Sequence, residues 1–84
     1  MDFPELADRA RTPKYRQIAD AITSAIQSGE LRPGQVLPSE KQIQDATGAG
    51  RNTARQAIAW LREQGWIETE PGRGSYVTDN PPAN

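Results

Sequence analysis

Five polar side chains between positions 51 and 56 are of types that hydrogen-bond to the bases and phosphates of nucleic acids. They are Arg51, Asn52, Thr53, Arg55 and Gln56. Arginine can donate two hydrogen bonds to O6 and N7 of guanine, and asparagine or glutamine can pair with adenine in the same way. Thr53 can bond a phosphate or simply cap the first turn of a helix. The alternative for the group is an ordinary solvated helix face, with Arg55 paired to a nearby carboxylate.

A helical wheel at about 100° per residue separates these side chains from an apolar stripe. The stripe consists of Ala54, Ala57, Ile58 and Leu61. Opposite the stripe lie Asn52 and Gln56, and one flank carries Arg51, Arg55 and Arg62. Arg51 and Arg55 are one turn apart near the expected helix N-terminus, the part of a recognition helix that meets base edges.

Two further residues are candidates for phosphate contact at the start of an earlier helix. Ser39 and Gln42 form the S-x-x-Q pattern of a capping box, so Ser39 is expected to cap this helix. A hydroxyl beside the free N–H groups of a helix N-terminus is also a natural phosphate ligand, and both roles are compatible. Lys41 lies in the first helical turn, where its charge opposes the macrodipole. A phosphate partner would explain Lys41, although solvated surface lysines are common.

Arg73 stands between two glycines, in the sequence Gly72-Arg73-Gly74. Glycine allows the backbone to approach a surface closely, and an arginine can enter a narrow minor groove. The alternative is a hairpin turn that needs glycine for its backbone conformation, with Arg73 present for solubility. The motif joins two strands instead of leading from a strand into a helix, so it is not a dinucleotide-binding fingerprint.

Composition restricts the classes of function. The 84 residues make one small domain with a net charge of −1 and a pI of about 5.3, whereas nucleic-acid-binding domains are usually basic. Without cysteine or histidine, we expect no disulfide, no metal site, no cofactor and no enzymatic activity. No signal peptide and no apolar window of about 18 residues is recognisable, which predicts a cytoplasmic protein without membrane contact.

Hydrophobic periodicity predicts three helices. The first runs from about Lys14 to Ser28, with Gly29 as a left-handed cap. The second follows Ser39, turns Ile43 and Ala46 inward, and ends at Gly48. The third opens at Gly50 or Arg51 and runs to about Gln64.

A short hairpin is predicted after the helices, from strands over 66–69 and 75–78 joined by the loop 71–74. Val36 and Leu37 are expected to be extended and buried. The fold class is therefore mostly α with a small β-hairpin (α+β), a winged helix-turn-helix of three helices and a two-stranded antiparallel wing. Residues 1–12 form an N-terminal extension, either a short helix that docks Phe3 and Leu6 onto the core or a frayed tail. Residues 13–78 form the domain, and 79–84 a tail or linker.

With these residues in place, the chain resembles the N-terminal winged helix-turn-helix domain of the GntR family of bacterial transcription regulators. The resemblance covers roughly residues 13–77. Its most specific segments are Tyr15-x-Gln17-Ile18, Ser28-Gly29-x-Leu31-x-Pro33-Gly34, Leu37-Pro38-Ser39-Glu40, Arg51-x-Thr53-x-Arg55-x-Ala57-Ile58 and Gly72-Arg73-Gly74-Ser75-Tyr76-Val77. The chain departs from the family pattern at Gln44, Ala49, Gly50 and Ala54, and Gly50 lacks a capping hydroxyl.

The resemblance implies sequence-specific binding to double-stranded DNA, most often as a repressor that binds a palindromic operator as a homodimer. It places Lys41 where the family often has a DNA-contacting arginine, and Arg51 and Arg55 at arginines that contact the major groove and phosphates. It places Gly74 at the wing glycine that approaches the minor groove. The effector domain that usually follows has no counterpart after Thr78, so an effector site is expected to be absent from this chain. The alternative function is a winged-helix module that binds protein.

Overall fold

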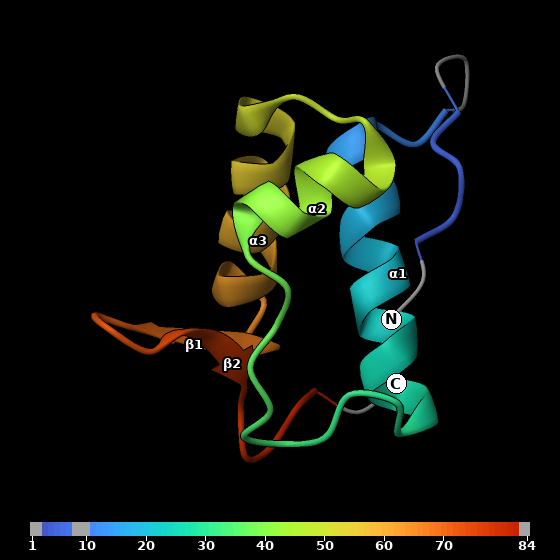
Figure 1. Ribbon diagram of the computed structural model, residues 1–84. Coiled ribbons are helices and arrows are strands. Elements are labelled where there is room, and N and C mark those ends of the chain that lie inside the picture. The colour runs from blue at the N-terminus through green and yellow to red at the C-terminus, as the bar shows by residue number, and fades with distance from the viewer. Residues whose placement is uncertain (1–2, 8–10, 83–84) are drawn as a thin grey trace.

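Three helices precede a two-stranded hairpin, which confirms the predicted fold class (Figure 1). The computed structural model describes residues 3–7 and 11–82. In chain order, the elements are α1 (Lys14–Ser28), α2 (Glu40–Thr47), α3 (Arg51–Glu63), β1 (Ile67–Glu70) and β2 (Gly74–Val77). In Figure 1, α2 lies across α1 and α3, and the hairpin projects to one side below α3.

A three-residue turn sets α3 against α2. The helix α2 ends at Gly48, whose φ of 74° lies in the left-handed region that favours glycine. The amide of Gly48 donates to the carbonyl of Gln44 at 2.8 Å, and α3 begins two residues after Ala49. Both ends of this turn agree with the prediction, as does the left-handed cap of α1 at Gly29.

The wing consists of β1 and β2 in antiparallel register, with Ile67 opposite Val77 and Glu70 opposite Gly74. Both strands are shifted by about one residue from the predicted ranges 66–69 and 75–78. A third segment pairs with the outer edge of β2, because the amide of Leu37 donates to Ser75 at 2.8 Å and that of Val77 to Gln35 at 3.0 Å. The loop after α1 is thereby tied to the wing.

The core takes side chains from every element. The largest side chains with essentially no exposure are Ile18, Ile22, Ile43, Leu61, Ile67 and Val77. Two predictions of burial are wrong. Val36 is extended but 51% exposed, because side chains alternate along an extended segment and the neighbouring Leu37 takes the inward side. Ala46 is exposed, because the buried face of the short α2 consists of Ile43 alone.

The N-terminal extension packs against the domain without forming a helix in residues 3–7. Phe3 and Leu6 contact the core, as the short-helix alternative predicted, although these residues are not helical. The Gln17 side chain holds this segment, since it accepts from the amide of Ala7 at 2.9 Å and donates to the carbonyls of Ala7 and Thr12. Asp2, where the alternative short helix would begin, lies outside the described residues.

Candidate nucleic-acid interface

The exposed face of α3 carries hydrogen-bond donors that no other described residue uses. The predicted division of the helix is confirmed: Ala54, Ala57, Ile58 and Leu61 are buried, and Arg51, Asn52, Arg55 and Gln56 are exposed. Within the described residues, the side chains of Arg51, Asn52 and Gln56 have no hydrogen-bond or ion-pair partner. A partner outside the chain can therefore bind them without first breaking an internal contact.

Arg55 differs from its neighbours because it is already paired. Its Nε lies 3.6 Å from Oε1 of Glu40, and the two side chains are 54% and 38% exposed. Pairing of Arg55 with a carboxylate was one of the predicted alternatives, and in the free chain Arg55 is paired in this way. Exposed pairs of this kind contribute roughly 0.2–1 kcal/mol. This ion pair links α2 to α3, but a phosphate or a base can replace Glu40 as the partner of Arg55.

The start of α2 shows the predicted capping box. The Ser39 hydroxyl oxygen accepts from the amide of Gln42 at 3.1 Å, and the Gln42 side-chain oxygen accepts from the amide of Ser39 at 2.8 Å. Ser39 uses only its acceptor in this arrangement, so its hydroxyl proton is available to an anion. Lys41, in the first turn of the helix, is exposed and has no polar partner among the described residues.

The start of α3 lacks an equivalent cap. Gly50 occupies the N-cap position and supplies no side-chain hydrogen bond. The Thr53 side chain makes no hydrogen bond within the described chain either, although capping or back-bonding was one of its two expected roles. The first-turn N–H groups and the half-buried Thr53 hydroxyl are thus left beside Arg51. Uncapped N–H groups at the positive end of a helix favour anionic ligands.

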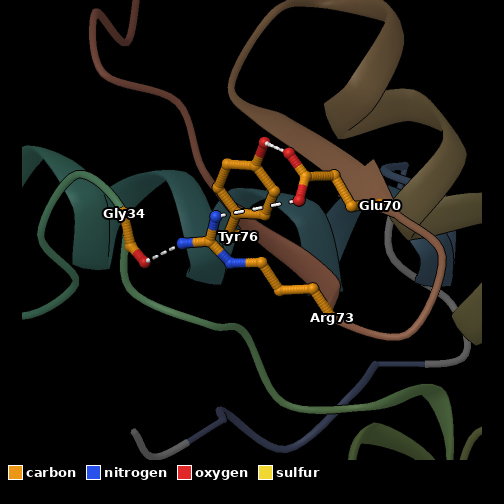
Figure 2. Close-up of polar contacts among 4 residues, drawn as sticks. All are labelled: Gly34, Glu70, Arg73 and Tyr76. Carbon is orange, nitrogen blue, oxygen red and sulfur yellow. Dashed lines mark hydrogen bonds and ion pairs between the residues drawn. The ribbon is translucent and has the colours of Figure 1, made fainter.

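At the wing, Arg73 is held against the molecule instead of projecting from the loop (Figure 2). Its guanidinium donates to the carbonyl of Gly34 at 3.2 Å, lies 3.9 Å from Oε2 of Glu70, and covers the ring of Tyr76 with its Cζ 3.9 Å from the ring centroid. The neighbouring Gly74 has a φ of 91°, a left-handed conformation that glycine adopts without strain. The backbone at Gly74 is exposed, as close approach to a surface requires.

Glu70 also binds the Tyr76 hydroxyl, which donates to its Oε1 at 2.7 Å. This hydrogen bond to the carboxylate, followed by desolvation and the nearby charges of Glu68 and Glu70, raises the pKa of Tyr76 to about 12. The positive charge of Arg73 opposes the shift. Glu70 therefore holds both the arginine and the aromatic ring on which that arginine lies.

A groove of about 540 Å³ separates the start of α2 from the wing. Ser39, Lys41, Arg73 and Gly74 line it, so four of the nine predicted residues share one depression. The other five, Arg51, Asn52, Thr53, Arg55 and Gln56, lie in the first two turns of α3. No sequence pattern indicated Gly34 and Tyr76 as partners of Arg73, although Glu70 stands only three positions before it in the hairpin.

No group of three or more histidine, cysteine, aspartate or glutamate side chains in the described ranges 3–7 and 11–82 is placed to hold a metal ion. Over the same ranges, none of the helices is long and apolar enough to cross a membrane.

The comparison with protein-family models decides the family. The model described as bacterial regulatory proteins, gntR family, matches residues 14–77. The chain belongs to this family. The match begins with α1 and ends with β2, so it contains every helix and strand described above.

Related sequences and solved structures agree with this family. The mannosyl-D-glycerate transport/metabolism system repressor MngR of Escherichia coli is 48% identical over 80% of this chain. The GntR-family transcription factor YtrA from Sulfolobus acidocaldarius superposes with a TM-score of 0.84 at 32% identity, covering 92% of this chain and 66% of that one. The DNA-binding domain of AraR in complex with operator ORX1 superposes with a TM-score of 0.82 at 30% identity, covering 93% and 99%.

These relatives are transcription regulators, not enzymes, and several are much longer than this chain. The match spans 28% of the length of MngR. It spans 18% of the arabinose metabolism transcriptional repressor of Geobacillus stearothermophilus, which is 36% identical over 79% of this chain. The shared region is therefore the winged helix-turn-helix domain, and the rest of those proteins has no counterpart in the 84 residues.

Proposed function

We propose that this gntR-family domain binds double-stranded DNA sequence-specifically and acts in the regulation of transcription. The observation that carries the proposal is the row of unused donors on Arg51, Asn52 and Gln56, within the first two turns of α3. In helix-turn-helix proteins this part of the second helix of the motif meets base edges in the major groove. The operator complexes of the similar AraR domain support the same docking for this chain.

The remaining candidates would anchor the domain on the phosphates. Ser39 and Lys41 would bind the backbone on one side of α3, and Thr53 would bind it at the uncapped helix start. Arg55 would leave Glu40 to contact a phosphate or a base. The wing would bring Gly74 and Arg73 to the neighbouring minor groove, where a narrow groove attracts arginine. The overall charge of −1 does not oppose this docking, since the field at the contacting face governs association.

We further propose that two copies bind a palindromic operator and repress transcription from the cytoplasm. A single module of this size covers only about 600–1,000 Å² of surface, so one copy is expected to bind weakly. Pairing on two half-sites raises the effective concentration of the second copy. The names of the relatives support repression, because MngR and the Geobacillus stearothermophilus relative are both called repressors.

The test is selection from a random duplex library with the purified chain, followed by fluorescence anisotropy of the selected duplex at several salt concentrations. We expect enrichment of an inverted repeat, and a logarithm of the binding constant that falls linearly with the logarithm of the salt concentration. Without enrichment, the selection is repeated with the chain fused to a dimerising coiled coil. Rescue by the fusion would indicate a missing dimerisation domain. Continued failure in a folded protein would favour the protein-binding alternative.

A further inference from the structure

The groove between α2 and the wing is lined by more cationic than anionic side chains. Its lining includes three cationic side chains, Lys41, Arg62 and Arg73, and one carboxylate, Glu40. Two positive charges are therefore in excess there, whereas the whole chain has a net charge of −1. The carboxylate of Glu40 is directed to Arg55, 3.6 Å away, and Arg73 is paired with Glu70, 3.9 Å away. Lys41 and Arg62 are therefore the two cations of the lining that have no carboxylate partner among the described residues. Such a lining suits an anion.

Arg62 is the member of this group for which no DNA contact has yet been assigned. It is exposed in the last turn of α3, and its Nε donates to Oγ1 of Thr69 at 3.2 Å. That bond fixes the side chain beside the wing but uses only one of the five guanidinium N–H groups. The other four have no partner among the described residues. The guanidinium is thus oriented by the chain and still open to a ligand.

Two hydroxyl groups extend this arrangement into the groove. Oγ1 of Thr69 and Oγ of Ser75 lie 3.0 Å apart, and either one can be the donor. Thr69 and Ser75 carry one hydroxyl proton each, and one of these protons forms the hydrogen bond between the two oxygens. The contact with Arg62 uses a proton of Arg62, so the second hydroxyl proton has no acceptor in the described chain. The hydroxyl proton of Ser39, across the groove, is also unused. Arginine, serine and threonine side chains are donors that bind phosphate oxygens in protein–DNA complexes.

The distance along α3 indicates which part of DNA Arg62 would meet. Arg51 and Arg62 lie on the same flank and are separated by eleven residues, or about 16 Å at 1.5 Å per residue. The major groove is only about 12 Å wide. If Arg51 reads a base edge and α3 points into the groove, Arg62 is too far along the helix to reach the same base edges and would meet the phosphate backbone.

We propose that Arg62, with Lys41 and the Ser39 hydroxyl, binds one backbone phosphate of duplex DNA in this groove. The inference rests on the proposed function and adds a contact at the C-terminal end of α3. The competing explanation is structural: a cation in the last turn of a helix favours the macrodipole, and the bond to Thr69 fastens the wing to α3. The test must separate these two roles.

The experiment compares Arg62→Gln, Arg62→Lys and Thr69→Val with the parent chain, and uses Arg11→Gln as a control for lost charge. The segment that carries Arg11 leads into α1, across the molecule from the wing (Figure 1). Binding to the selected duplex and to a mixed-sequence duplex is measured by anisotropy between 50 and 200 mM salt. Urea unfolding shows whether each variant remains folded.

Each phosphate contact contributes about 0.9 to the slope of log K against log salt. We expect Arg62→Gln to lower the slope by about one on both duplexes. Between 50 and 200 mM salt, the parent would then lose about 3.5-fold more affinity than the variant. Arg62→Lys should retain the slope because it retains the charge. Thr69→Val should also retain the slope, because the charge of Arg62 remains in the groove when the orienting bond is lost.

An unchanged slope in folded Arg62→Gln, or equal effects of Arg62→Gln and Arg11→Gln, would overturn the inference while leaving DNA binding intact. A slope that Thr69→Val lowers as much as Arg62→Gln would favour the structural role. If the folded parent bound neither duplex, the proposed function and this inference would fail together.

Discussion

Arg73 must change partners before it can enter a minor groove, and Glu70 determines how readily it does so. In the free chain, the Arg73 guanidinium is held by Glu70, by the Gly34 carbonyl and by the ring of Tyr76 (Figure 2). Replacing Glu70 by glutamine removes the ion pair but retains an oxygen that can accept from the Tyr76 hydroxyl. We therefore expect Glu70→Gln to release Arg73 and to strengthen binding of the selected duplex.

The size of the gain follows from the geometry of the pair. The two charged groups are 3.9 Å apart, and their side chains are 46% and 52% exposed. Exposed pairs of this type contribute roughly 0.2–1 kcal/mol, which corresponds to a gain of about 1.4-fold to 5-fold in affinity. Removing a negative charge near DNA also helps by itself. Glu68→Gln is the matched control, because Glu68 lies on the same strand and, among the described residues, forms no ion pair or hydrogen bond with Arg73.

The assay is anisotropy of the selected duplex at a fixed, moderate salt concentration, with both substitutions also made on an Arg73→Ala background. Glu70→Gln should bind more tightly than Glu68→Gln in the parent, and the two should be equal once Arg73 is absent. Equal binding in the parent background would show that the pair does not oppose docking. Weaker binding by Glu70→Gln would show that the geometry of Figure 2 is itself the one that meets DNA, and would refute the reasoning.

Three further predictions address recognition, capping and pH. Arg51→Ala should weaken operator binding by about 1–3 kcal/mol and relax base preference at one position of a repeated selection, and binding equal to the parent would reject the recognition-helix assignment. Ser39→Ala should lower the free energy of unfolding by about 1 kcal/mol in urea titrations, whereas Ser24→Ala, at an exposed α1 site, should not. The hydrogen bond and the other interactions that raise the pKa of Tyr76 to about 12 stabilise the fold below pH 10. This contribution to the free energy of unfolding should vanish as the pH rises from 10 to about 12. Tyr76→Phe should remove the change of the unfolding free energy with pH over that interval. An ultraviolet titration in which the Tyr76 phenol ionises near pH 10 would contradict the assigned cause.

The helices, their ends and the exposed row on α3 were predictable from the sequence. Apolar spacing of three and four residues specifies which side of α3 is buried, and the Ser39–Gln42 pair and Gly48 mark the ends of α2. These features depend on residues within one or two turns of each other. Local sequence therefore determined them, and with them the placement of Arg51, Asn52 and Gln56 on an exposed helix face.

Tertiary structure decided which partner each charged side chain contacts. Arg73 reaches the carbonyl of Gly34, 39 positions away, only because the loop after α1 pairs with β2. Arg55 meets Glu40 only because α2 packs across α3, and Val36 is exposed because Leu37 takes the inward side. An arginine has several carboxylates and carbonyls within reach in principle, and its partner depends on which elements pack together. That choice is a property of the folded chain.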